Sequence, residues 1–131
     1  MSKRPAMGST RAKRTVAADG REFPSKAEAA RWDYLRMLYR GKQISDLWAQ
    51  PEYVVFQKGP VSIRYTPDFG YIQNGETILE EVKGMADTAY LLRRKMFVAS
   101  FPSLPLYEIR GKKRLRVYLT AKGLCRTREE C

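Results

Sequence analysis

The chain has 131 residues, enough for one domain with a single modest core, and its formal net charge of +11 favours a polyanionic partner. It contains no histidine, which excludes histidine general bases and His-ligated zinc, and the spacing of its two cysteines fits no zinc site. No apolar run is long enough to cross a membrane or to serve as a signal peptide, so we expect a cytoplasmic protein without a membrane partner.

The surplus positive charge lies at the two ends of the sequence. Residues 1–21 carry six lysines and arginines against one aspartate, and residues 110–131 carry eight against two glutamates. Such ends suit contacts to nucleic-acid phosphates, and the alternative is a pair of solubilising tails. We expect residues 1–14 to be a flexible basic arm, residues 15–120 a single domain, and residues 121–131 a frayed basic tail.

The first structured segments are predicted from turn and capping signals. Residues 13–23 fit a short hairpin that turns at Asp19-Gly20. A helix should cover residues 25–40 and end at Gly41, because Ser25-x-x-Glu28 is a capping box and glycine commonly follows a helix.

Glu28 has two interpretations. As part of the capping box, its carboxylate would return to the backbone amide of Ser25. Glu28 also lies at helical spacing with Trp32, Leu35 and Tyr39, on the stripe expected to face the core. A carboxylate that points inward needs a partner, and a metal ion shared with other carboxylates would supply one.

The middle of the chain is predicted to be a β-meander. Residues 44–48 are expected to be a short connector, and residues 52–57 form a β-rich run. Residues 61–73 are predicted as one long strand, bent near Thr66-Pro67 because proline interrupts a hydrogen-bonded ladder. Residues 76–83 complete the meander.

Asn74-Gly75 is the strongest local signal in the sequence, since this pair is typical of a type I′ hairpin turn. A two-residue turn there places Asp68 opposite Glu81, and Thr66 opposite Lys83. Directly opposed residues share a face, and alternation puts Glu81 and Lys83 on the same face. Two opposed carboxylates repel each other, so the hairpin needs a compensating cation such as Mg²⁺.

The C-terminal half predicts a second helix over residues 88–100, capped by Asp87 or Thr88, and two strands over residues 106–110 and 115–119. The expected apolar stripe of this helix consists of Ala89, Leu91, Leu92, Met96, Val98 and Ala99. The strand–helix–strand order implies a parallel pair with a right-handed crossover. The fold class is therefore α/β or α+β, with a mixed central sheet that contains an antiparallel meander and is flanked by two helices.

Two short motifs in this order resemble a known family of nucleases. Pro67-Asp68 followed by Glu81-Val82-Lys83 is similar to the PD-(D/E)XK motif. With Glu28 and Gln50-Pro51 upstream, the order resembles a small phage-borne branch of that superfamily, similar to Holliday junction resolvases, and also the end-cleaving nuclease subunits of some transposons. The likeness covers about residues 14–101 and implies a restriction-endonuclease-like core.

The resemblance implies a Mg²⁺-dependent DNA endonuclease in which Mn²⁺ can substitute. Glu28, Asp68 and Glu81 would hold one or two ions, whose bound water supplies the nucleophile without histidine. Lys83 would orient that water or stabilise charge on the phosphate, and its alternative is a simple cross-strand salt bridge. Gln50 would aid positioning, or would only cap a turn.

The basic residues are candidates for DNA contacts, with a solvated face as the alternative for the second helix. The candidate DNA-binding residues are Lys13, Arg14, Arg93, Arg94, Lys95, Lys112, Lys113 and Arg114. The sequence contains no recognisable DNA-reading motif, so we expect DNA shape, such as a branch or junction, or a partner to set specificity. A homodimer is expected, and the alternatives are a nuclease subunit of a larger complex and a non-catalytic DNA-binding module.

Overall fold

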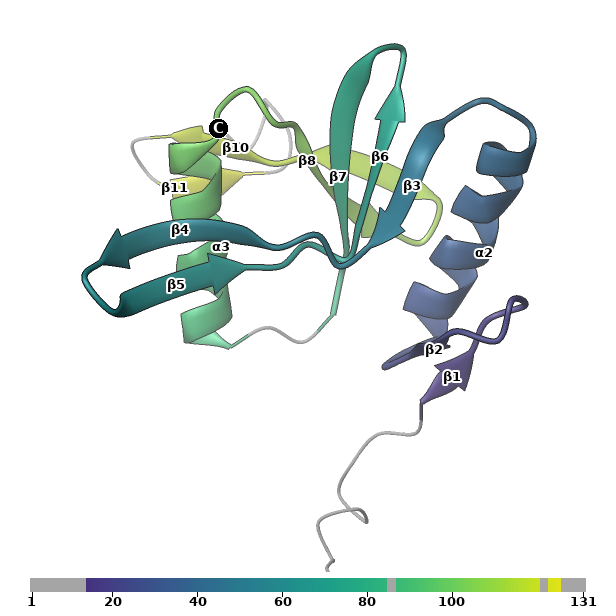
Figure 1. The fold of residues 1–131 in the computed structure, drawn as a ribbon, viewed down its shortest axis with the longest axis horizontal. Helices are drawn as coiled ribbons and strands as arrows, with labels where there is room; N and C mark the ends of the chain where they lie inside the picture. The colour runs from purple at the N-terminus through teal and green to yellow at the C-terminus, as the bar shows by residue number, and fades with distance from the viewer. Residues whose placement is uncertain (1–13, 85–86, 121–122, 126–131) are drawn as a thin grey trace, which may run out of the picture.

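The computed structural model of the protein describes residues 14–84, 87–120 and 123–125. This part of the chain is a mixed α+β fold, in which helices α2 (Lys26–Arg40) and α3 (Thr88–Ser100) lie on opposite sides of a five-stranded sheet (Figure 1). The strands of the sheet, in spatial order, are β3 (Ser45–Ala49), β6 (Phe69–Gln73), β7 (Glu76–Val82), β8 (Leu106–Arg110) and β9 (Lys113–Arg116). The other described strands pair as β1 (Thr15–Val16) with β2 (Glu22–Phe23), β4 (Tyr53–Lys58) with β5 (Val61–Tyr65), and β10 (Tyr118–Thr120) with β11 (Gly123–Cys125).

The central hairpin of β6 and β7 has the predicted register. Gln73 pairs with Glu76 and Phe69 pairs with Glu80, so the two-residue turn is confirmed. Asn74 and Gly75 both have positive φ, at 53° and 78°, which is the backbone of a type I′ turn. β7 then pairs in parallel with β8 across the α3 crossover, as the strand–helix–strand order predicted.

Helix α2 has the predicted limits. The Ser25 side chain accepts the backbone N–H of Glu28, and Gly41 ends the helix. Trp32 and Leu35 are buried as predicted, but the prediction for Tyr39 is wrong, because that side chain is 50 % exposed. The buried face follows a three-residue step instead, so that Leu38 packs against the core in its place.

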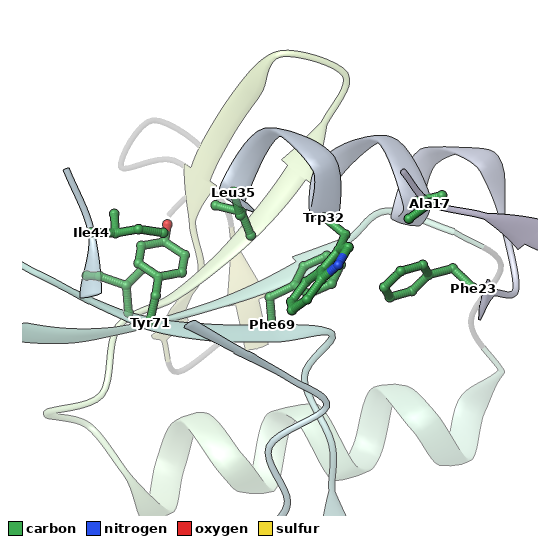
Figure 2. Close-up of a cluster of buried hydrophobic side chains, with 9 residues drawn as sticks. Ala17, Phe23, Trp32, Leu35, Ile44, Phe69 and Tyr71 are labelled. Carbon is green, nitrogen blue, oxygen red and sulfur yellow. The ribbon is translucent and has the colours of Figure 1, made fainter. Parts of the chain in front are cut away.

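An aromatic cluster joins α2 to the sheet on one side (Figure 2). Trp32 stacks on Phe69 of β6 with ring centroids 5.6 Å apart, and Phe23 of β2 lies 5.8 Å from each ring. The indole N–H of Trp32 donates to Asp19 at 3.0 Å. The β1–β2 hairpin, predicted from Asp19-Gly20, is thereby attached to α2.

Helix α3 covers the other side of the sheet, and its limits and its Asp87 cap are as predicted. The predicted apolar stripe is confirmed only for Met96 and Val98, which pack against the core. Leu91 and Leu92 are exposed instead, while Arg94 and Phe97 are buried. The ring of Phe97 lies against aromatic rings of both the β4–β5 hairpin and the end of α3. These contacts set the rotation of α3, so that Arg94 and Phe97 face inward while Leu91 and Leu92 remain exposed.

Four predicted segments differ from the structure. The predicted strand over residues 115–119 is divided, because β9 ends at Arg116 and β10 begins at Tyr118 in a different sheet. Residues 44–48 are not a connector, because β3 forms there with Trp48 paired opposite Gly70. The predicted strand over residues 61–73 is two strands in two different sheets, because the ladder breaks at residues 66–68. The C-terminal stretch is not wholly frayed, since β11 pairs with β10. No helix in the described part of the chain is long and apolar enough to cross a membrane.

Gly70→Ala tests the packing of β3 on β6. A Cβ at this position would lie 2.9 Å from two ring atoms of Trp48. We expect the substitution to lower the free energy of unfolding in urea by about 1–3 kcal/mol. In a Trp48→Leu background the same change should cost less, because the ring is gone. An equal cost in both backgrounds would show that this contact is not the cause.

Candidate functional site

A hollow of about 520 Å³ lies where the start of α2, the end of β7 and the start of α3 meet. It is lined by Ser25, Ala27, Glu28, Thr66, Asp68, Glu81, Val82, Lys83, Gly84, Tyr90, Leu91, Arg94, Glu108 and Arg110. All four predicted catalytic residues are in this set, although they come from three separate parts of the sequence. The geometry of each decides what the hollow can do.

Asp68 is held at the point where the β6–β7 ladder ends. Its Oδ2 accepts the backbone N–H of Val82 at 2.7 Å, so the carboxylate takes the place of a ladder carbonyl across the hairpin. Its own carbonyl accepts the backbone N–H of Gln50 at 2.8 Å. Both contacts leave Asp68 beside the strand that carries Glu81 and Lys83, as the predicted register requires.

The Asp68 carboxyl is in an environment that disfavours its charge. Its pKa is raised from 3.8 to about 7, chiefly by burial and also by the neighbouring charges of Glu28 and Glu81, against the opposing effect of the Val82 hydrogen bond. The raised pKa therefore reflects the burial of Asp68 first and the two nearby carboxylates second.

Glu28 is both a helix-capping residue and part of the hollow. The Ser25 hydroxyl accepts the Glu28 backbone N–H at 3.1 Å and donates to the Glu28 Oε1 at 3.0 Å. The carboxylate is thus oriented by a hydroxyl, whereas a simple capping box would engage the backbone amide. It also faces Asp68 closely enough to raise the pKa of that residue.

Glu81 is buried on the side of the sheet that faces α3. The Tyr65 hydroxyl donates to its Oε1, and Arg94 Nη1 donates to its Oε2 at 2.8 Å. The same Arg94 nitrogen lies 3.2 Å from Glu108 Oε1, and Arg110 Nε donates to Glu108 Oε2. Glu81 and Glu108 are directly paired on the parallel strands β7 and β8, so one cation serves two neighbouring carboxylates.

The predicted placement of Arg94 on an exposed basic face is wrong, because only 7 % of the residue is exposed. Burial would by itself lower the pKa of Arg94, but Glu81 raises it above the ordinary value, so the cation is retained. The roles of Tyr65 and Glu108 were missed as well. A usable signal was present, since Glu108 and Glu81 each interrupt apolar strands whose parallel pairing was predicted.

Glu80 lies on the opposite face of β7, away from the hollow, as alternation predicted. Arg31 of α2 binds it through Nε and Nη2 at 2.7 and 2.6 Å, and the Tyr71 hydroxyl also donates to it. Arg114 in turn donates to the Tyr71 hydroxyl at 3.0 Å. This second network packs α2 against the sheet.

Lys83 and Gln50 contribute in different ways. The Lys83 side chain lines the hollow, and its backbone N–H donates to Ile109 at 2.9 Å. It forms no ion pair with a carboxylate of the described residues, which removes support for the salt-bridge alternative. The Gln50 side chain is exposed and does not line the hollow, so only its backbone, with φ at 53°, positions Asp68.

The carboxylates do not form a ready metal site in this arrangement. Among the residues that the structure describes, no three Asp, Glu, Cys or His side chains are grouped to hold one ion. Glu28 and Asp68 face each other, whereas both oxygens of Glu81 are bound by Tyr65 and Arg94. Oxygen donors of this kind suit Mg²⁺, but Glu81 must change partners to join them.

The candidate DNA-binding residues are spread over several surfaces. Lys13 lies outside the described residues, and Arg14 pairs with Glu22 at 3.2 Å. Lys95, Lys112 and Lys113 are exposed. Arg114 lies 4.2 Å from the centroid of the Tyr107 ring, on the side of the sheet away from the hollow.

A second hollow adjoins the first and contains Arg93. It has a similar volume of about 520 Å³ and shares Thr66 and Tyr90 with the first. Arg64 of β5 also lines it, and the sequence analysis missed this residue although it lies only three residues before Pro67. The two hollows thus adjoin at Thr66 and Tyr90, and the second is lined by two arginines and no carboxylate.

The fold and the site together define a mixed α+β protein with a hollow lined by carboxylates and a lysine at the end of its central sheet. The chain belongs to the DUF1064 family, described as a protein of unknown function, whose sequence model matches residues 7–116. The match includes every element from the β1–β2 hairpin to β9, and all four predicted catalytic residues. No curated protein and no solved structure matches the chain.

Asp68→Asn tests whether the folded protein disfavours the charged form of Asp68. Because folding raises the pKa of Asp68 to about 7, the folded protein holds a proton that the unfolded chain releases. The stability associated with that proton is full below about pH 4 and is lost as the pH rises to 7. Asparagine keeps an oxygen for the Val82 N–H and carries no charge.

The variant should therefore be more stable than the wild type above pH 7, by up to about 4 kcal/mol, with a smaller gain at pH 5. Urea unfolding in a chelator at pH 5 and pH 8 measures this difference. A gain of equal size at both pH values would contradict the assignment.

Proposed function

We propose that this protein is a Mg²⁺-dependent DNA endonuclease of the PD-(D/E)XK type with a restriction-endonuclease-like core. The observation that carries the proposal is the convergence of Glu28, Asp68, Glu81 and Lys83 in one hollow. These residues come from a helix, the start of one strand and the end of the paired strand, in the order of the motif. The parallel β7–α3–β8 unit that follows is consistent with such a core.

The residues of the hollow suit a divalent cation in their chemistry. Three carboxylates supply the oxygen donors that Mg²⁺ prefers, and a bound cation would favour the charged form of Asp68, which burial and the nearby Glu28 and Glu81 disfavour. When bound, the ion would lower the pKa of a coordinated water. Glu28 is oriented for this role by Ser25, and Asp68 by the Val82 amide.

Lys83 has the role of a charge-stabilising residue in this proposal. Its ammonium group is exposed to the hollow, while its backbone is fixed to β8 through Ile109. From this position it would bind the phosphate under attack and stabilise the charge that develops there. The sequence contains no histidine, so no histidine takes part in the proposed mechanism.

The DNA would lie along the two joined hollows. Arg64 and Arg93 would hold a phosphate of the strand that enters the carboxylate hollow, and the exposed Lys112 and Lys113 would extend the basic track. Such contacts carry no sequence information, so we propose selection by DNA shape, as in branched or junction DNA. One site would cut one DNA strand, so a homodimer would supply the two cuts needed on a symmetric branched DNA.

The second candidate function is a non-catalytic DNA-binding module. It is favoured by one observation, the engagement of both Glu81 oxygens by Tyr65 and Arg94. In that case the carboxylates would serve the fold alone. A nuclease subunit that requires a protein partner is intermediate between these two functions. Its catalytic residues would be intact, but the isolated protein would not cut DNA.

The cleavage test uses linear duplex, flap and four-way junction DNA, each with Mg²⁺, with Mn²⁺ or with chelator. We expect cleavage of a branched substrate only with a divalent ion. Asp68→Asn and Lys83→Ala should each reduce the rate by at least about 100-fold while DNA binding persists. Lys42→Ala, an exposed lysine just beyond the far end of α2, is the control and should cut like the wild type. Binding without cleavage of any substrate would favour the non-catalytic module.

The contribution of the second hollow is measured by salt dependence. In the double variant Arg64→Ala/Arg93→Ala, the slope of log affinity against log salt should fall by about two, one for each lost phosphate contact. The cleavage rate at saturating DNA should change little, because the carboxylate hollow is untouched. Arg40→Ala, at the end of α2, should leave the slope as it is. An unchanged slope in the double variant would remove this hollow from the DNA path.

A further inference from the structure

Arg94 is a buried cation in direct contact with one of the proposed metal ligands. Its Nη1 lies 2.8 Å from Glu81 Oε2 and 3.2 Å from Glu108 Oε1, and all three residues are buried. Glu81 therefore already has a positive charge in contact with it. That charge belongs to the protein itself.

The second oxygen of Glu81 is engaged as well. Tyr65, which is fully buried, donates its hydroxyl to Oε1. Both oxygens of Glu81 are thus bound to groups of the protein, although its charge is close enough to Asp68 to raise the pKa of that residue. This arrangement accounts for the lack of a three-ligand group in the described part of the chain.

Arg94 keeps a partner if Glu81 leaves. Glu108 contacts the same nitrogen and is itself held by Arg110. An arginine with one carboxylate would become an uncompensated buried charge when that carboxylate moved, which is strongly unfavourable. With two carboxylates, Arg94 stays paired in either state. Its Nε, which has no partner among the described residues, is a further unused donor.

We propose that Arg94 and Tyr65 are positioning residues that hold Glu81 in the metal-free protein, and that a divalent cation binds by taking Glu81 from them. This inference rests on the proposed function, because it takes the hollow to be a metal site. Glu81 then binds either the ion or Arg94 and Tyr65, and the balance between these two sets of contacts determines the affinity for the ion. Weakening the internal hold should strengthen ion binding.

The protein contains a matched control for this inference on the other face of β7. Glu80, the neighbour of Glu81, is bound by Arg31 and by the hydroxyl of a buried tyrosine, Tyr71. Neither Arg31 nor Tyr71 lines the carboxylate hollow. Each variant at Tyr65 or Arg94 thus has a counterpart that removes the same chemical group from an equivalent buried network.

The test is Mn²⁺ binding by the full chain without DNA, measured by calorimetry. Tyr65→Phe should bind Mn²⁺ at least about fivefold more tightly than the wild type, because one hydrogen bond to the charged Glu81 is lost. The net charge is unchanged, so a general electrostatic effect cannot produce this gain. Tyr71→Phe should leave the affinity within about twofold of the wild type, since its hydroxyl belongs to the other network.

Arg94→Met should also tighten Mn²⁺ binding and Arg31→Met should not, and where Arg94→Met fails to fold, the tyrosine pair still decides the outcome. Adding Asp68→Asn to Tyr65→Phe should abolish the gain, which would place the ion in the hollow.

Binding that is weaker in Tyr65→Phe, or equal to that of Tyr71→Phe, would overturn the inference. If the wild type still bound Mn²⁺ and cut DNA, the proposed function would survive that result. Absence of both Mn²⁺ binding and cleavage in every variant would overturn the inference and the proposed function together.

Discussion

The structure depends on how strand β7 accommodates two adjacent glutamates while buried on both faces. Alternation sends Glu80 to the α2 side of the sheet and Glu81 to the α3 side. A buried carboxylate is tolerated only when it is paired and hydrogen-bonded. Each helix therefore contributes one arginine, Arg31 from α2 and Arg94 from α3. The two ion pairs hold both helices against the same strand, so the rotation of each helix is linked to the charge on β7.

The candidate site arises where this arrangement ends. Beyond Glu80 the β6–β7 ladder stops, and the Asp68 carboxylate replaces the missing carbonyl at the Val82 amide. The start of α2 brings Glu28 to the same place, where its charge disfavours the ionised form of Asp68. A buried carboxylate with a raised pKa is thus built on rigid elements, with strands and a helix start fixing each acidic side chain. Such sites are commonly functional, which is the physical basis of the proposed metal-dependent chemistry.

The asymmetry between the two faces of β7 separates structure from proposed function. On the α2 side, Glu80 receives two hydrogen bonds from one guanidinium, and its network is completed by Tyr71 and Arg114. On the α3 side, Arg94 divides one nitrogen between Glu81 and Glu108. The Arg31–Glu80 pair is a bidentate ion pair with a fixed geometry. The second leaves an alternative partner for the arginine, so it suits a carboxylate that changes its contacts.

The sequence by itself determined the features that depend on neighbouring residues. Asn74-Gly75 defined the turn and hence the register that brings Asp68 close to Glu81, and Ser25 and Asp87 marked the starts of the two helices. Only the tertiary structure decided which way α3 turns, because aromatic contacts to distant strands and the carboxylates of β7 and β8 act together on it. It also decided that residues 45–49 form a strand, since Trp48 packs over a glycine more than twenty residues away. Contacts between residues remote in sequence set these features, and local spacing carries no information about them.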